Sequence, residues 1–230
     1  MKNKDFILGI LGGLGPMAGV ELQKRIIMAS PAKTDQEHIK MVCFTNPKIK
    51  DRTHALQKGN DFSQEVIRSL TLMSLIRVSV GIMVCNTAHA DFDKIKKGVK
   101  YPLINLVLET VEYLRLKYSY YSKVGLLATD GTLQSGIYHQ ALAKYGFKVV
   151  APTINGQQIL MQTIYGPVGI KAGYFQNNKR IVNNLIKKLQ DNGAQIIILG
   201  CTELSLVGIK GNSVLDPLDV MAKKIVGLAY

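Results

Sequence analysis

The sequence lacks several features that would each assign it to a particular class of protein. No apolar run approaches the roughly 18 to 20 residues that a membrane-spanning helix needs. Three cysteines, an odd number in a chain of 230 residues, do not form a typical disulfide framework. There is no C-x-x-C pair and only four histidines are present, so a closed zinc site is not expected. We therefore expect no membrane span, no disulfide scaffold and no bound metal.

The first residues also lack a complete secretory signal. They combine a basic start with a short apolar run, but Asp5 interrupts that start. The run ends at Gly12 and Gly13, and no small-residue cleavage motif follows. We interpret the run as a first buried strand followed by a turn, and we expect the protein to be cytoplasmic.

Acidic residues are scarce, because 16 Asp and Glu stand against 29 Lys and Arg and the formal net charge is +13. Such an excess of positive charge favours anionic partners, and nucleic acid is one candidate. The basic residues are dispersed, however, and form only short clusters such as the one between Lys94 and Lys100. Solvated lysine faces of helices explain this pattern more simply. We therefore expect a small anionic substrate and no nucleic acid.

Short apolar segments alternate with segments of helical periodicity along the chain. The apolar segments are rich in β-branched residues and lie at 7–11, 39–44, 80–84, 103–106, 124–128, 149–151 and 196–199. Three-to-four spacing of apolar residues predicts helices at 20–28, 62–76, 106–116, 135–145, 180–189 and 217–228. Strands that are apolar throughout and alternate with helices predict an α/β fold whose parallel sheets are covered on both faces.

The same order of features occurs in both halves of the chain. Each half begins with a strand that runs into a glycine turn, continues with a strand that ends near a proline, and later has a strand that ends in cysteine. This order is typical of a duplicated α/β unit. We expect two pseudo-symmetric lobes, at 1–102 and 103–209, each a parallel sheet flanked by helices, with the active site in the cleft between them. The segment 210–230 is expected to return to the first lobe.

A glycine-rich turn, G-G-L-G-P at 12–16, follows the first predicted strand. Pro16 suits the first position of a helix, and the backbone N–H groups of such a turn can hold an anion. The spacing does not match the dinucleotide fingerprint G-x-G-x-x-G, and no G-K-[ST] phosphate loop follows. The turn therefore favours the border of a small-anion pocket over a nucleotide site.

Cys85 and Cys201 each follow a predicted strand, about half the length of the chain apart. Ligands of parallel α/β sheets bind outside the carboxyl ends of the strands, which is where both thiols are expected. A helix that begins at a cysteine would lower the pKa of the thiol from its usual value of about 8.5. Cys43 lies within a strand, so we expect it to be a buried core residue.

Two thiols that face each other suit the inversion of a carbon that carries a hydrogen. A base removes the proton from one face of the carbon, and an acid on the opposite face supplies a new one. One sulfur can be a thiolate while the other stays protonated, and the roles exchange in the reverse reaction. An amino-acid substrate also needs hydrogen-bond donors at its carboxylate, because negative charge develops there as the proton leaves.

Together these motifs resemble the aspartate/glutamate racemase superfamily, and within it the aspartate racemases. The matching segments are G-G-L-G-P-M-A, N-P-K-I-K-D-R-T, V-C-N-T-A-H, L-L-A-T-D-G-T, Q-T-I-Y with I-K-A-G, and L-G-C-T-E-L, in family order across nearly the full length. The pair C-N-T-A-H and G-C-T-E-L is the most specific. The resemblance implies racemisation by two cysteines without a cofactor such as pyridoxal phosphate, two pseudo-symmetric α/β lobes and, frequently, a homodimer.

The resemblance also implies roles for individual residues of this sequence. Cys85 and Cys201 are the acid/base pair, and Glu203 orients the neighbouring thiol or the substrate amine. Arg52, assisted by Lys171, pairs with the distal carboxylate, with ordinary surface charge as the alternative for both. The other residues expected to bind the amino-acid substrate are Leu14, Asn86, Thr87, Ala88, Thr129 and Thr202.

The predicted function is the interconversion of L- and D-aspartate, because the guanidinium of Arg52 can bind a carboxylate through two parallel hydrogen bonds. Lys50 and Leu14 depart from the aspartate racemase pattern, where proline and methionine are common. Broad-specificity racemases and maleate isomerases of the superfamily are alternatives. Arylmalonate decarboxylases are disfavoured because they usually need only one cysteine. Outside enzymes, the alternative is a non-catalytic small-anion or nucleic-acid binding protein on the same scaffold.

Overall fold

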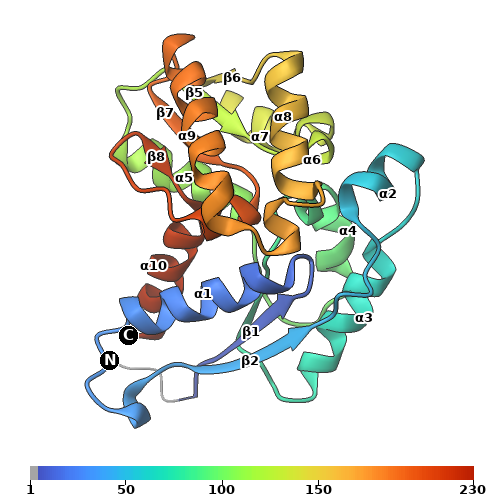
Figure 1. Ribbon diagram of the computed structural model, residues 1–230. Helices are drawn as coiled ribbons and strands as arrows, with labels where there is room; N and C mark the ends of the chain where they lie inside the picture. The colour runs from blue at the N-terminus through green and yellow to red at the C-terminus, as the bar shows by residue number, and fades with distance from the viewer. Residues whose placement is uncertain (1–4) are drawn as a thin grey trace.

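The computed structural model describes residues 5–230 and contains two four-stranded sheets (Figure 1). The strand order is β2-β1-β3-β4 in the first sheet and β6-β5-β7-β8 in the second, so the two orders are equivalent. Every neighbouring pair of strands is parallel. The predicted α/β fold with two similar lobes is confirmed.

The central strands of both sheets are almost completely buried. The first sheet consists of β1 (Ile7–Gly12), β2 (Lys40–Thr45), β3 (Val80–Met83) and β4 (Leu103–Ile104). The second consists of β5 (Lys123–Leu127), β6 (Lys148–Val150), β7 (Ile196–Leu199) and β8 (Val214–Leu215). The central pairs β1/β3 and β5/β7 are covered on both faces, which is why they are apolar throughout.

Helices of various lengths connect these strands. They are α1 (Pro16–Ala29), α2 (Arg52–Lys58), α3 (Ser63–Ser74), α4 (Phe92–Lys97), α5 (Leu106–Lys117), α6 (Asp130–Ser135), α7 (Ile137–Ala143), α8 (Ile154–Tyr165), α9 (Phe175–Asp191) and α10 (Pro217–Ala229). Pro16 is the first residue of α1, as predicted. Within residues 5–230, no helix is both long and apolar enough to cross a membrane.

Four helices, α2, α4, α6 and α8, were not predicted from the sequence. α2 and α4 have only seven and six residues, which is too short for a clear periodicity. α8 carries mostly polar residues in its first turns. The helix expected at 135–145 corresponds to α7, and Gly136, whose φ of +69° lies in the left-handed region that favours glycine, separates it from α6.

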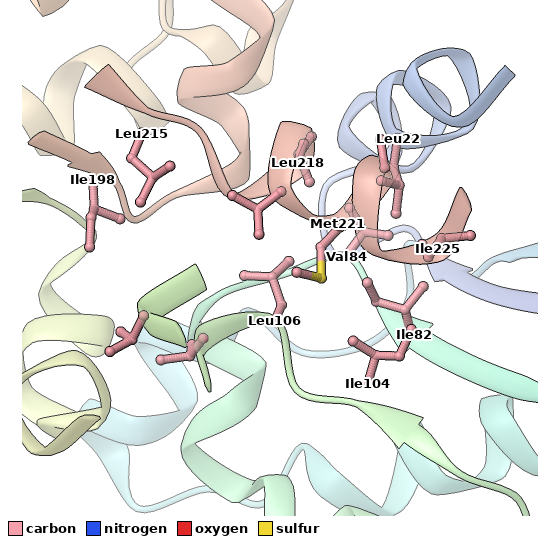
Figure 2. Close-up of a cluster of buried hydrophobic side chains, with 14 of the residues drawn as sticks. Leu22, Ile82, Val84, Ile104, Leu106, Ile198, Leu215, Leu218, Met221 and Ile225 are labelled. Atoms are coloured by element: carbon pink, nitrogen blue, oxygen red, sulfur yellow. The ribbon is translucent and has the colours of Figure 1, made fainter. Parts of the chain in front are cut away.

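One hydrophobic core connects the two lobes, and α10 runs through it (Figure 2). This core takes one face of each sheet, for example Ile82 of β3 and Ile198 of β7, together with side chains of α1, α5 and α7. Leu218, Met221 and Ile225 of α10 are fully buried in it, which contributes about 1.5 to 3 kcal/mol for each side chain. α10 also packs against α1, so this helix fixes the position of the second lobe against the first.

The sheets divide the chain differently from the predicted lobe boundaries of 1–102 and 103–209. β4, at 103–104, pairs with β3 of the first sheet, and β8, at 214–215, pairs with β7 of the second. A strand of two residues is too short to be assigned to a lobe from its sequence. We therefore propose a boundary after β4, with α10 as the segment that returns to the first lobe.

The prediction that Cys43 is buried is wrong. Cys43 lies on β2, which is an edge strand of the first sheet, and its side chain is exposed. An apolar run in the sequence does not distinguish a central strand from an edge strand, because strand order is set by the tertiary structure.

The loops that follow the central strands of both sheets meet between the lobes. α1, which follows β1, contacts the 3-10 helix η4 (Thr202–Val207), which follows β7. α6, which follows β5, contacts α2 and the 3-10 helix η2 (Thr87–Asp91), which follows β3. Ligands of parallel α/β sheets bind at these strand ends, so the region between the lobes is the candidate site.

Candidate active site

The two strand-ending cysteines occupy equivalent positions in the two sheets. Cys85 comes two residues after β3 and is followed by η2, and Cys201 comes two residues after β7 and is followed by η4. Both side chains are buried, each with 6% of its surface exposed. The repeated strand order thus gives each lobe one thiol at the same place in its topology.

A cavity of about 350 Å³ lies between the lobes at these strand ends. Four residues that the sequence predicted as substrate-binding line it, namely Leu14 and Arg52 from the first lobe and Lys171 and Glu203 from the second. The other lining residues are Gly13, Gly15, Pro16, Met17, Ala18, Pro47, Ile49, Asp51, Ile170, Gly173, Phe175 and Leu206. The glycine turn predicted to border an anion pocket is therefore part of its wall.

Two glycines of this turn lie close to other parts of the site. Gly13 has a φ of +90°, and a Cβ atom there would lie 2.3 Å from the backbone carbon of Asn46. A Cβ atom at Gly15 would lie 2.0 Å from the Oε1 atom of Glu203. Gly13 therefore has to be glycine, and at Gly15 the turn of the first lobe closely approaches the carboxylate of Glu203 in the second lobe.

Cys201, Glu203 and Lys171 form a hydrogen-bonded chain in the second lobe. The thiol of Cys201 donates to Oε2 of Glu203 at 3.0 Å, and Nζ of Lys171 donates to Oε1 of the same carboxylate at 2.8 Å. Thr202 also donates to Oε2, at 3.4 Å. Burial first, and then the negative charge of Glu203, raise the pKa of Cys201 well above its ordinary value. The expectation that a helix start would lower this pKa is wrong for Cys201, since burial and the carboxylate outweigh any helix effect.

Arg52 is the first residue of α2, and its guanidinium is buried with 6% of the residue exposed. It donates to the backbone carbonyl oxygens of Ile49, Lys50 and Leu14. Burial acts to lower the pKa of Arg52, but the charge of Cys85 and a hydrogen bond to this sulfur help to raise it. Surface charge, the alternative for this residue, does not fit its position in the structure.

Lys171 is also largely enclosed, with 25% of its side chain exposed. Burial acts to lower its pKa, but the charges of Glu203 and both cysteines outweigh burial and raise it, so the ammonium group stays charged. Cys85 and Cys201 are not among the residues that line the cavity, but the charges of both act on the ammonium group of Lys171, which does line it.

Two of the predicted residues, Thr87 and Thr129, belong to a buried cluster of threonine hydroxyl groups that joins the lobes. The Oγ1 atoms of Thr87 and Thr129 are 3.1 Å apart. Thr53 of α2 donates to Thr129 at 3.0 Å, and Thr132 of α6 lies 2.8 Å from Thr87. α2 and α6 are therefore connected by hydroxyl groups directly behind the cavity wall that carries Arg52.

The remaining predicted residues of the first lobe have different environments. Asn86 accepts a hydrogen bond from the hydroxyl of Tyr138 at 2.6 Å through Oδ1. Its Nδ2 atom is buried and has no hydrogen-bond partner among the described residues, and the same holds for Nε of Arg52. Ala88 is fully buried in the core of the first lobe, away from the cavity lining. Its predicted contact with the substrate stays a prediction.

Tyr165, the last residue of α8, was not predicted as a site residue although its segment Q-T-I-Y belongs to the resemblance. Its hydroxyl donates to Oδ2 of Asp51 at 3.1 Å and to Oγ1 of Thr53 at 3.4 Å, both at the start of α2. Nζ of Lys171 lies 5.2 Å from the centre of its ring. Burial first, and then the charges of Cys201 and Asp51, raise the pKa of Tyr165, so the phenol stays protonated.

His89 is a second residue that the sequence reasoning missed, although it lies in C-N-T-A-H. Nδ1 donates to the backbone oxygen of Cys85 at 2.8 Å, and Nε2 accepts from the backbone N–H of Leu106 at 3.1 Å. Burial lowers the pKa of His89 to about 4, so the ring is neutral and its two nitrogens have fixed roles. His89 thereby positions the backbone of Cys85.

Among residues 5–230, no group of three or more His, Cys, Asp and Glu is placed to hold a metal ion.

Comparison with known proteins agrees with this arrangement. Residues 11–225 match the family model described as Asp/Glu/Hydantoin racemase. The broad specificity amino-acid racemase RacX of Bacillus subtilis (strain 168) is 24% identical over 208 residues, which cover 87% of each chain. The structure of the aspartate racemase of Picrophilus torridus has a TM-score of 0.84 and 27% identity, over 97% of this chain and 94% of that one.

A further structure shares the fold at lower identity. PH1733, an aspartate racemase homologue from Pyrococcus horikoshii OT3, has a TM-score of 0.76 and 24% identity, over 96% of this chain and 98% of that one. The family model spans both strand-ending cysteines, the glycine turn and the cavity residues of both lobes. From this match, and from the equivalent placement of the two thiols, it follows that the chain belongs to the Asp/Glu/hydantoin racemase family.

Proposed function

We propose that this protein interconverts the L and D forms of an amino acid, with aspartate as the preferred substrate. Cys85 and Cys201 are the two acid/base groups, and the reaction needs no cofactor. The observation that carries the proposal is the pair of thiols at equivalent strand ends of two lobes that enclose one cavity. Inversion of a carbon requires proton removal and proton delivery on opposite faces, and two such groups supply both.

The charges around the cavity support a dicarboxylate substrate. Arg52 and Lys171 both line it, one from each lobe, and both remain positively charged. One cation is enough for the α-carboxylate of any amino acid, and a second cation has a use when the side chain ends in another carboxylate. Aspartate is the shortest common amino acid with this property.

Two predicted substrate-binding residues each have a buried donor without a partner among the described residues. Nε of Arg52 and Nδ2 of Asn86 are paired with no other group of the described residues. A buried donor without an acceptor costs about 1 to 3 kcal/mol, so such groups are commonly completed by a ligand. The α-carboxylate becomes more negative as the α-proton leaves, and we assign the free donor of Asn86 to it, while Arg52 is assigned to the distal carboxylate.

The proposal is tested by incubating the purified protein with single L-amino acids in D₂O. Loss of the α-proton is followed by NMR, and the product is analysed for chirality. We expect L-aspartate to exchange its α-proton and to approach an equal mixture of both enantiomers, while L-alanine reacts much more slowly. The double variant Cys85→Ser/Cys201→Ser is the control and should show no exchange. An intact protein that exchanges no α-proton of any amino acid would refute the proposed function.

Racemisation with broad specificity is the second candidate. It is favoured by the similarity of nearly the whole chain to the broad specificity amino-acid racemase of Bacillus subtilis. Arg52 also donates to three backbone carbonyl groups, which limits the donors left for a side-chain carboxylate. Comparable exchange rates for aspartate and for neutral amino acids in the same NMR experiment would support this candidate.

Three further features belong to the proposal. We infer that the protein is cytoplasmic, that it forms a homodimer, and that its only small-molecule partner at this site is the amino acid. Light scattering at micromolar concentration tests the dimer.

A further inference from the structure

Both oxygens of the Glu203 carboxylate are engaged, and they bind groups with different roles. Oε2 accepts the hydrogen of the Cys201 thiol, and Oε1 accepts from the ammonium group of Lys171. The carboxylate is buried, with 4% of the residue exposed. A buried carboxylate depends on its cation, because the loss of solvation is not compensated otherwise. The state of the Cys201 thiol is therefore connected through one carboxylate to the position of Lys171.

Of the two charged partners, Glu203 is the more tightly held and Lys171 has a second contact. Glu203 is buried and accepts hydrogen bonds from Cys201, Thr202 and Lys171. The side chain of Lys171 is longer and more exposed, and its ammonium group also lies over the ring of Tyr165. A shift of Lys171 away from Glu203 would therefore keep a favourable contact with the aromatic ring, whereas Glu203 would have to leave a closely packed position.

We propose that the distal carboxylate of a bound dicarboxylate draws Lys171 away from Glu203 and thereby frees Glu203 to accept the proton of Cys201. This inference rests on the proposed function and adds a regulation of the same site. In the absence of a distal carboxylate, Lys171 stabilises ionised Glu203 and the thiol keeps its proton. When the substrate engages Lys171, the carboxylate of Glu203 lacks its cation. The protonated, neutral form of Glu203 then becomes more favourable.

The proton steps balance without another reactant. The S–H bond of Cys201 breaks, an O–H bond forms at Oε2 of Glu203, and the electron pair stays on sulfur. The thiolate then takes the α-proton, the electron pair of that C–H bond passes into the α-carboxylate system, and the thiol of Cys85 protonates the opposite face. After product release, the proton on Glu203 returns through solvent to the thiolate of Cys85.

This coupling has a consequence that ordinary binding of the distal carboxylate does not have. If the carboxylate only anchors the substrate, its absence weakens binding and leaves the chemical step unchanged. If it releases Glu203, its absence slows the chemical step itself. The two cases can be separated by supplying the carboxylate as a second molecule, with alanine and formate as the two parts of aspartate.

The experiment measures α-proton exchange of saturating L-alanine in D₂O by NMR, with increasing sodium formate at constant ionic strength held with sodium chloride. We expect formate to accelerate the exchange about tenfold or more in the wild-type protein, which is within the range of general base catalysis. Formate should have no such effect on Lys171→Met, in which no ammonium group can move. Lys187→Met is the matched control, because Lys187 is an exposed lysine of α9, and it should respond to formate like the wild type.

The outcomes separate this inference from the proposed function. If the wild type racemises aspartate but formate leaves alanine exchange unchanged, the coupling is refuted and the function stands. An equal response of Lys171→Met and wild type would also refute it, because formate would then act elsewhere. If no amino acid exchanges its α-proton, the proposed function itself fails. Circular dichroism of each variant ensures that a lost response does not reflect unfolding.

Discussion

The two cysteines have equivalent positions in the fold but opposite electrostatic partners. Cys85 lies beside the guanidinium of Arg52, whereas Cys201 donates a hydrogen bond to the carboxylate of Glu203. Each partner comes from the same lobe as its cysteine. The duplicated backbone thus gives geometric symmetry, while the side chains give each thiol a different electrostatic environment. In the proposed reaction either enantiomer is the substrate, and the two thiols that act on it have different charged neighbours.

The largest expected effect comes from removing either thiol. Cys85→Ser and Cys201→Ser should each lower racemisation by about 10³-fold or more, since general acid–base groups contribute on the order of 10² to 10⁴-fold and both are needed. Each variant should still exchange the α-proton of one enantiomer in D₂O, and the two variants should prefer opposite enantiomers. NMR with pure L- and D-aspartate measures this.

A single variant that keeps full two-way racemisation would contradict the two-base mechanism. If both variants exchange the same enantiomer, the assignment of one thiol to each face of the substrate is wrong.

The next largest effect is expected from Arg52, the partner of Cys85. Arg52→Ala should lower kcat/KM for aspartate by about 100-fold, equivalent to one or two charge-assisted hydrogen bonds of about 1.5 to 3 kcal/mol each. Alanine turnover should fall less, so that the preference for the dicarboxylate decreases. Unchanged selectivity for aspartate over alanine would remove Arg52 from substrate choice. Arg68→Ala is the control, because Arg68 is an exposed arginine of α3.

The partner of Cys201 is tested by pH. Burial and the charge of Glu203 raise the pKa of Cys201, so this thiol should react with iodoacetamide only at pH values above the range of an ordinary cysteine. In a Cys43→Ser/Cys85→Ser background, Glu203→Gln removes the negative charge and should shift the alkylation profile to lower pH. The shift should be incomplete, because burial is the larger cause. An unchanged profile would show that Glu203 does not act on the thiol.

The smallest effect is expected from Tyr165, which contacts the start of α2 and the ammonium group of Lys171. Tyr165→Phe removes the hydrogen bonds to Asp51 and Thr53 but keeps the ring beneath Lys171, so kcat/KM for aspartate should fall only about three- to tenfold, the equivalent of about 1 kcal/mol for a hydrogen bond. Tyr165→Leu also removes the cation–π contact, so its kcat/KM for aspartate should be lower still. Equal rates for both variants would show that the ring does not contribute.

Much of the fold was predictable because its signals are local. Central strands such as β3 and β7 are apolar throughout and are separated by periodic helices, and this pattern alone predicts a parallel sheet. The edge position of Cys43, the two-residue strands β4 and β8, and the break at Gly136 were not predictable. They depend on which strands become neighbours and on backbone dihedral angles, and neither quantity has a periodic signature in the sequence.

The sequence by itself determined that two thiols end equivalent strands, that a glycine turn follows the first strand, and that Arg52 and Lys171 accompany them. Only the tertiary structure decided that Arg52 lies beside Cys85, that Lys171 pairs with Glu203, and that Tyr165 connects α2 with Lys171. The physical reason is that hydrogen bonds and charge interactions act over a few ångströms in space, and the packing of the two lobes around α10 determines which distant residues come that close.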